Sequence, residues 1–274
     1  MNYIDRLFKL EGKVALITGG GGVLAGAIGS GLAQAGAKII LADINLEKAV
    51  ANAESIIGEN CSAFGLHMDA LDTHSIQEAC KRILSEHERI DILINAAGGN
   101  IPGATISPDK TIFDLNIKDF DRVSDLNYKS TLLPTLEVGR IMARQKSGSI
   151  INISSMAAMR TITRVVGYSA AKAAVSNFTR WMAMEMAMKH SGAIRVNAIA
   201  PGFFIGDQNR ALLTNSDGTP TERGKLVIQN TPMERFGNAD ELIGAVLFLA
   251  SESASFVTGV ILPVDGGFSF HSGV

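Results

Sequence analysis

The chain has 274 residues, 46% of them hydrophobic and 19% charged, and 25 basic residues nearly balance 27 acidic ones to give a formal net charge of −2. With no block of lysine and arginine, this composition argues against a nucleic-acid or membrane-surface protein and favours a small polar substrate as the partner. The two cysteines, Cys61 and Cys80, lack Cys-x-x-Cys spacing and indicate free thiols in a reducing compartment.

Further features narrow the class of protein. The five histidines show no metal-ligand spacing, so we expect no metal. Residues 1–13 carry charges where a signal peptide needs an apolar segment, and no run reaches transmembrane length, so we expect a cytoplasmic protein with no membrane contact. The length suits one large α/β domain over residues 1–274, or two smaller domains, and we favour one.

Short apolar runs alternate along the chain with segments long enough for helices. The apolar runs are 13–18, 38–43, 62–69, 91–98, 148–155, 194–202 and 260–267. Helices are expected at about 24–36, from Thr73, within the irregular segment that ends at Lys146, around Tyr168, and near 238–252. Asn238 and Glu241 form a capping-box pattern at the start of the last one.

The alternation predicts right-handed β-α-β units. It therefore predicts an α/β, single-domain, Rossmann-type doubly wound fold, with a parallel sheet of about seven strands and helices on both faces.

A glycine-rich turn follows the first apolar run. The sequence TGGGGVLAGAIG (18–29) allows backbone N–H groups to approach a phosphate at a helix N-terminus. Asp43 ends the second apolar run, where an acidic residue accepts hydrogen bonds from an adenosine ribose. Asp43 would repel a 2′-phosphate and no arginine adjoins it, so the pattern predicts NAD(H) in preference to NADP(H). An aspartate at a strand end can also cap a turn.

Tyr168 and Lys172 lie four residues apart in GYSAAKAAVSNF (167–178) and share a face if this run is helical. Most such pairs are solvated surface contacts. Carbonyl reduction, however, needs a proton for the developing alkoxide, and a tyrosine with a pKa of about 10 holds its proton tightly near neutrality. A lysine charge about 4 Å away contributes roughly 4 kcal/mol at an effective dielectric of about 20, so we expect it to lower the phenol pKa by about 3 units before desolvation.

Several separate motifs resemble those of the short-chain dehydrogenase/reductases, over nearly the entire chain. They are TGGGGVLA, HMDA with Asp69, NAAG (95–98), DLNYKS with Asn127, NISS with Ser155, YSAAK, PG (201–202) and VDGG (264–267). The resemblance implies a catalytic tetrad of Asn127, Ser155, Tyr168 and Lys172. In that tetrad Ser155 holds the substrate oxygen, and Asn127 positions water for a proton relay through Lys172.

The resemblance also implies a homotetramer and a set of cofactor contacts. The implied contacts are Gly19, Gly21, Gly22, Leu24, Asp43, Asp69, Ala70, Asn95, Ala96, Ala97, Gly98, Tyr168, Lys172, Pro201, Gly202 and Phe204. Val23 and Ala25 depart from the family pattern, which usually has glycine at both positions. The extra Cβ atoms bear on how closely the backbone of the turn approaches the pyrophosphate. Gly206 stands where many relatives place a threonine near the nicotinamide end.

The 203–236 segment lies between the PG motif and the last expected helix, and we expect it to form a lid over the substrate. The predicted substrate contacts are Ser155, Arg160, Arg164, Gln208, Asn209 and Arg210. Arginine pairs with carboxylates in bidentate geometry, although surface solvation explains any one of these arginines equally well.

Four stretches resemble the D-mannonate oxidoreductase, or fructuronate reductase, subgroup: TGGGGVLAGAIG, PGFFIGDQNRALL, TERGK and VDGGFSFHSGV. The resemblance implies interconversion of D-fructuronate and D-mannonate in hexuronate breakdown. Gluconate 5-dehydrogenase is an alternative, as is 3-oxoacyl-carrier-protein reductase, against which Asp43 and the lack of a basic cluster argue. A non-catalytic nucleotide-sensing regulator is an alternative from another class, against which the intact tetrad argues.

Overall fold

The seven apolar runs form seven β-strands of one sheet, paired in parallel in the order β3-β2-β1-β4-β5-β6-β7. The computed structural model describes residues 2–56, 61–206 and 209–272. The strands are β1 (Val14–Thr18), β2 (Lys38–Asp43), β3 (Ser62–His67), β4 (Ile92–Asn95), β5 (Gly148–Ile153), β6 (Ile194–Pro201) and β7 (Ile261–Val264). The predicted fold class and strand count are confirmed.

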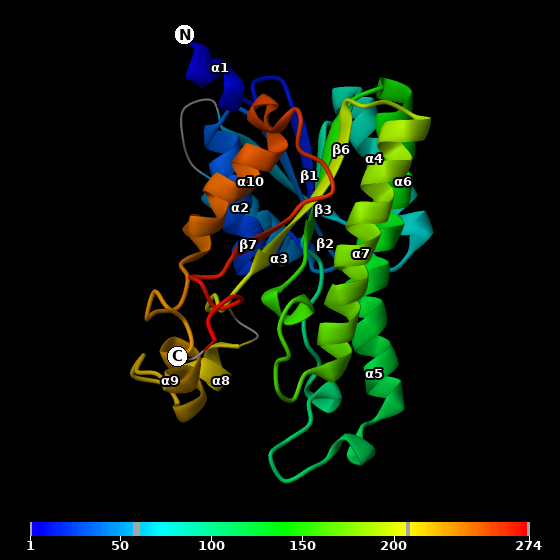
Figure 1. Ribbon diagram of the computed structural model, residues 1–274. Helices are drawn as coiled ribbons and strands as arrows, with labels where there is room; N and C mark the ends of the chain where they lie inside the picture. Colours follow the sequence, from blue (N-terminus) through cyan, green and yellow to red (C-terminus); the bar gives the residue numbers. More distant parts are fainter. Residues whose placement is uncertain (1, 57–60, 207–208, 273–274) are drawn as a thin grey trace.

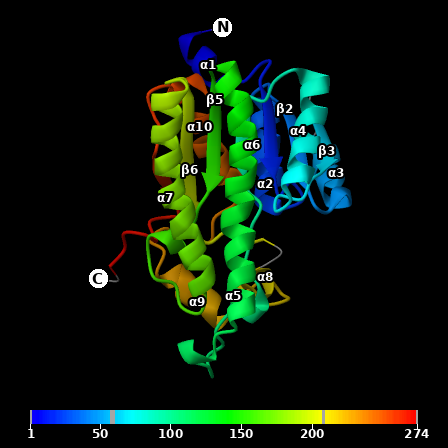
Figure 2. The same cartoon turned by 90° about the vertical axis from the view of Figure 1, so that its right-hand side faces the viewer.

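Helices cover both faces of the sheet (Figure 1). One face carries α2 (Val23–Gln34), α3 (Leu46–Ser55) and α10 (Ile243–Ala250), and the other carries α4 (Thr73–His87), α6 (Ser130–Gln145) and α7 (Val166–Lys189). In Figure 2, α6 and α7 lie in front of β5 and β6. All five residues of β1 are buried because alternate side chains pack into opposite cores, which explains the continuous apolar runs.

The chain between β4 and β5 contains more elements than its sequence indicates. Two 3-10 turns (Pro102–Ala104 and Ile112–Asp114) lead to α5 (Ile117–Ser124), and a π-helical turn (Asp125–Lys129) joins α5 to α6. The short helix α1 (Tyr3–Phe8) precedes β1. Asn238 forms the predicted capping box, but the turn it caps, Ala239–Leu242, is 3-10, and the α-helix begins at Ile243.

The described residues of the 203–236 segment lie beyond the carboxyl ends of the strands (Figure 1). It contains α8 (Arg210–Leu213) and α9 (Glu222–Gln229), and Thr221 joins them by donating its hydroxyl to the Leu212 carbonyl at 2.7 Å. Within the portion that the structure describes, no helix is both long and apolar enough to cross a membrane. The strand order reverses between β1 and β4, which is where ligands bind in open α/β sheets.

Candidate active site

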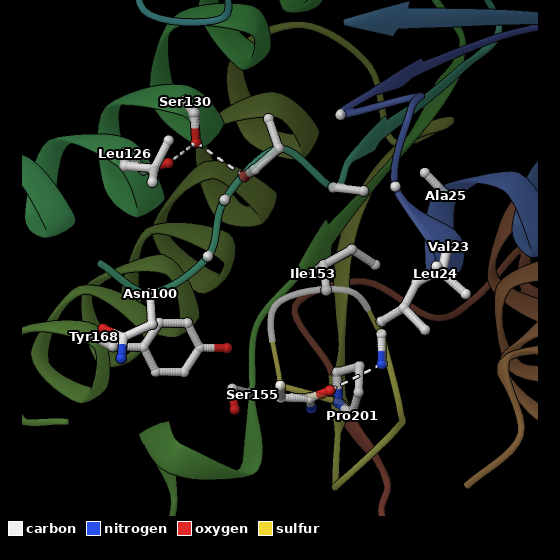
Figure 3. A pocket seen from close by; sticks show the side chains of 18 of the residues that line it. Val23, Leu24, Ala25, Asn100, Leu126, Ser130, Ile153, Ser155, Tyr168 and Pro201 are labelled. Atoms are coloured by element: carbon white, nitrogen blue, oxygen red, sulfur yellow. Dashed lines mark hydrogen bonds between the residues drawn. The ribbon is translucent and has the colours of Figure 1, made fainter. Parts of the chain in front are cut away.

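A cavity of about 750 Å³ opens at the carboxyl ends of the strands. It is lined by the turn after β1, the ends of β2 and β5, the stretch after β4, the start of α7 and the 203–236 segment. In Figure 3, Tyr168 extends into this cavity, and Val23 and Leu24 lie across it. The predicted residues that line it are Gly19, Gly21, Gly22, Leu24, Asp43, Asp69, Ala70, Ala96, Ala97, Gly98, Ser155, Tyr168, Lys172, Pro201, Gly202, Phe204 and Asn209.

The glycine turn forms one end of the cavity. Gly19 has φ +66°, and a Cβ there would lie 2.8 Å from the Cα atom of Ala97, so the turn packs directly on the neighbouring backbone. Gly22 precedes α2 with no side-chain cap on the helix. This helix N-terminus against a cavity suits a phosphate group. The Asn52 amide supports the turn from α3 by donating to the carbonyl of Gly20 at 2.8 Å.

The two departures from the family's glycine pattern are accommodated differently. Val23 is the first residue of α2 and its side chain is 40% exposed. Ala25 is only 3% exposed because it packs into the core beneath α2. The backbone of residues 19–22 therefore still packs closely on the neighbouring main chain. With the extra Cβ atoms at positions 23 and 25, the start of α2 still lines the cavity.

The Asp43 carboxylate occupies the end of β2 and lines the cavity. One oxygen accepts a hydrogen bond from the Gly21 N–H at 3.0 Å and the other accepts from the Asn45 N–H at 2.8 Å. The side chain thus caps a turn and also lines the cavity. Its position is compatible both with a turn cap and with a contact to an adenosine ribose. Lys48 lines the same end and is a cation that the sequence reasoning did not consider.

Asn95 does not line the cavity, contrary to its prediction as a cofactor contact. Its side chain is 1% exposed and donates to the Thr135 hydroxyl and the Asn152 carbonyl oxygen, both at 2.8 Å. The side chain points inward because it follows the strand alternation of β4, so it ties β4 to β5 and α6. The next two N–H groups, of Ala96 and Ala97, both donate to the Thr18 hydroxyl at 3.1 Å and fix the cavity wall.

Asn127 lies behind that wall, in the π-helical turn, and is fully buried. Its amide donates to the Gly99 carbonyl at 2.7 Å and accepts from the Gly99 N–H at 3.1 Å. A Cβ at Gly98 would lie 2.7 Å from the Asn127 carbonyl oxygen and 3.4 Å from the Lys172 ammonium. Glycine at 98 therefore leaves room for the Asn127 and Lys172 side chains, which both lie where a Cβ would stand.

Tyr168, Lys172 and Ser155 meet where α7 begins over the end of β5. The Lys172 ammonium lies 5.7 Å from the centre of the Tyr168 ring and donates to the Ile153 carbonyl at 2.7 Å. Burial lowers the Lys172 pKa to about 8. Ser155 caps a 3-10 turn by accepting from the Ala157 N–H at 3.1 Å, and its hydroxyl hydrogen-bonds with the Tyr168 phenol.

The Lys172 charge was expected to lower the Tyr168 pKa before desolvation is counted, and in this structure desolvation prevails. Burial raises the pKa of the phenol, and the hydrogen bond with Ser155 opposes that rise. Loss of hydration is the main cause of the rise, because an ionised phenol in a buried site gives up its water.

Three of the six predicted substrate residues, Arg160, Arg164 and Arg210, lie outside the cavity lining. Arg160 and Arg210 are exposed, and Arg160 donates to the His271 carbonyl at 2.9 Å. Arg164 is half-buried but does not line the cavity, and Gln208 lies outside the described residues. Asn209 lines the cavity, yet its amide is bonded to the backbone of Phe204 at 2.8 Å.

Two polar residues that the sequence reasoning missed line the substrate end. Arg223 reaches the cavity from α9. Asn100 reaches it from the stretch after β4, as Figure 3 shows. The Asn100 carbonyl oxygen and the Arg223 Nε are both buried and have no hydrogen-bond partner. Arg223 lies within the TERGK motif, which was its only signal in the sequence. Among the described residues, no group of three or more His, Cys, Asp or Glu side chains is placed to hold a metal ion.

Comparison with known proteins gives consistent results. A family model described as Enoyl-(Acyl carrier protein) reductase matches residues 22–269. A Haemophilus influenzae protein named "Uncharacterized oxidoreductase" is 44% identical over 277 residues, covering 97% of this chain and 96% of its own. This chain belongs to the short-chain dehydrogenase/reductase family. The resemblance predicted from the motifs is confirmed.

Solved structures from the short-chain dehydrogenase/reductase family share the fold but differ in ligand. A "putative D-Mannonate oxidoreductase", also from Haemophilus and with bound NAD, has a TM-score of 0.90 and 43% identity, covering 99% of this chain and 100% of its own. A gluconate 5-dehydrogenase from Burkholderia cenocepacia, in complex with NADP and tartrate, has a TM-score of 0.83 and 32% identity, covering 97% and 99%. Among relatives found by sequence, the 3-oxoacyl-[acyl-carrier-protein] reductase of Aquifex aeolicus is 35% identical, covering 94% of this chain and 98% of its own.

Proposed function

We propose that this protein is an NAD(H)-dependent oxidoreductase that interconverts the ketone and alcohol of a sugar acid, with D-fructuronate and D-mannonate as the pair. The observation that carries the proposal is one cavity with Ser155, Tyr168 and Lys172 on one side and the glycine turn with Asp43 on the other. A regulator that only sensed a nucleotide would have no use for a phenol, a hydroxyl and an ammonium gathered at the inner end of that cavity.

The residues that would hold the dinucleotide are those around the glycine turn and the stretch after β4. Gly19, Gly21 and Gly22 would receive the pyrophosphate at the start of α2, Asp43 the adenosine ribose, and Asp69 and Ala70 the adenine. Ala96 to Gly98, Pro201, Gly202 and Phe204 would flank the nicotinamide end. When bound, nicotinamide supplies the hydride for reduction or accepts it in oxidation.

The protein's own contribution is to position the carbonyl oxygen and move one proton. Ser155 and Tyr168 would both hydrogen-bond the substrate oxygen, and the phenol would donate its proton to the developing alkoxide. In the reverse direction the phenolate takes the proton of the alcohol. Lys172 lies beside the phenol and, with Asn127 behind Gly98, forms our proposed route for returning that proton to solvent.

The preference for NAD(H) rests on Asp43. A carboxylate fixed by two N–H groups at this end of the cavity would repel a 2′-phosphate, whereas Lys48 nearby would attract one. The bound NAD of the Haemophilus structure supports a preference for NAD(H). The bound NADP of the Burkholderia structure shows that the family accommodates both NAD and NADP.

The substrate class is supported by the name of the Haemophilus neighbour and by the cation Arg223 at the substrate end. Gluconate 5-dehydrogenase remains an alternative because that relative binds tartrate, also a hydroxy acid. A 3-oxoacyl-carrier-protein reductase is a weaker alternative, favoured by the Aquifex relative.

The test is NADH oxidation by the purified protein with D-fructuronate and with 5-keto-D-gluconate, and with NADPH as the cofactor comparison. We expect turnover of D-fructuronate with NADH preferred. Asp43→Ala should narrow the ratio of catalytic efficiencies between NADH and NADPH by roughly tenfold, since it removes about 1.4 kcal/mol of discrimination. An unchanged ratio would remove Asp43 from this role, and turnover of neither keto acid would reject the substrate assignment.

We also propose that residues 1–274 act as one domain with the 203–236 segment as the substrate lid, and that the protein is a cytoplasmic homotetramer. Trp181, Met184 and Met188 form an exposed stripe on α7 that self-association would bury.

A further inference from the structure

The substrate end of the cavity has mostly apolar walls. Ile162 and Val165 line it from the loop before α7, and Leu212 and Leu213 line it from α8. Arg223, at the second position of α9, is the sole arginine among the described residues that line the cavity. Arg223 is half-buried there, and a guanidinium that has lost part of its hydration is stabilised when an anion pairs with it.

The hydrogen-bond donors of the Arg223 guanidinium make only weak contacts within the protein. One terminal nitrogen lies 3.4 Å from the Thr163 hydroxyl, and the other lies 3.5 Å from the Thr163 carbonyl. Both contacts are long for an N–H···O bond, which is usually about 2.9–3.0 Å. The Nε atom is buried and has no partner. Three donor atoms of one fork therefore lack a strong acceptor.

The charges around Arg223 are also unbalanced. In the described parts of the chain no carboxylate lies within 4.0 Å of its guanidinium, and the adjacent Glu222 pairs with Lys225. Burial lowers the pKa of Arg223, and the positive charge of Arg164 lowers it further. Arg223 is therefore a cation of the cavity lining with no carboxylate beside it, so an anion would be attracted to this end of the cavity.

The loop that carries Arg164 is held in place rather than free to separate the two charges. Arg164 has φ +76°, a left-handed backbone conformation that arginine rarely adopts. Its carbonyl accepts a hydrogen bond from the Ile106 N–H at 2.9 Å. Since strained backbone persists only where the surroundings fix it, the main-chain position of Arg164 is part of the native fold.

We propose that Arg223 is the specificity-determining residue that receives the carboxylate of the substrate, in bidentate geometry, from α9. The inference rests on the proposed function, because it assigns the acid group of the proposed sugar acid to one residue. It also explains why the arginines expected from the sequence are not needed: Arg160 and Arg210 lie outside the cavity. An uncharged ketone with the same chain would lack this contact.

The test compares D-fructuronate with D-fructose, which carries a hydroxymethyl group in place of the carboxylate. For Arg223→Gln we expect kcat/KM for D-fructuronate to fall about 100-fold, mostly through KM, while kcat/KM for D-fructose and the NADH Kd stay unchanged. Arg223→Lys should recover part of the loss, because an ammonium keeps the charge without the bidentate fork. The matched control is Lys225→Gln, which removes an exposed cation from the same helix.

Calorimetric binding of D-mannonate to the NADH complex separates this inference from the proposed function. If D-mannonate binds the wild type and binding weakens about 100-fold in Arg223→Gln, the inference stands even where no keto acid is turned over and the proposed function fails. Equal binding to both proteins, no binding of D-mannonate to the wild type, or an equal loss of activity on D-fructuronate and D-fructose would each overturn it.

Discussion

Burial is the main influence on the pKa of the Tyr168 phenol, which it raises, and the hydrogen bond with Ser155 opposes that rise. The sequence spacing places Lys172 on the right face of α7, and the structure confirms that placement. The direction of the pKa shift was not predictable, because it depends on how much water the fold removes from both groups.

The pH dependence of alcohol oxidation tests this point. Oxidation needs the phenolate, so its rate should rise with pH up to the Tyr168 pKa. The Ser155 bond lowers that pKa, and Ser155→Ala should therefore raise it and move the rising limb to higher pH. The measurement is kcat/KM for oxidation across pH 6–11. A limb that stays in place or moves to lower pH contradicts the assignment, and Tyr168→Phe, which should lose turnover while binding NADH, is the control.

At the scale of elements, the strands were predictable and the segment between β4 and β5 was not. Each parallel strand is buried on both faces and so appears as an apolar run, whereas the π-helical turn around Asn127 depends on bonds to Gly99, 28 residues away. Arg223 was missed for a similar reason. A Cβ at Gly224 would clash with the Leu213 carbonyl, so α9 lies close against α8 and brings Arg223 to the cavity, a contact with no signature in sequence.

Asn95 gives a prediction at this scale, because it joins β4 to β5 and α6 instead of touching the cavity. Asn95→Ala would leave Thr135 and Asn152 without their donor inside the core. We expect the free energy of unfolding to fall by about 2–4 kcal/mol, measured by urea denaturation, with the NADH affinity of the folded protein unchanged. A variant of normal stability that has lost NADH affinity would restore Asn95 as a cofactor contact.

For the whole molecule, the exposed apolar stripe on α7 bears on assembly. Trp181 is 53% exposed, Met184 51% and Met188 79%, and they share one face because their spacing is i, i+3, i+7. We expect the wild type to sediment as a tetramer and Met184→Glu with Met188→Glu to shift it to smaller species, since two charges would be buried in the interface. A monomeric wild type would refute the proposed tetramer.

The 203–236 segment leaves and rejoins the fold at nearly the same point: the Gly237 N–H donates to the Phe203 carbonyl at 2.9 Å, and Phe204 and Gly237 form a parallel bridge. Its ends are thus held together by the main chain, whatever residues lie between them. Because the entropy of closing a loop grows only slowly with its length, insertions and replacements here cost the sheet little. Evolution can therefore replace this one segment and change the substrate specificity, while the residues that carry out the redox chemistry stay the same.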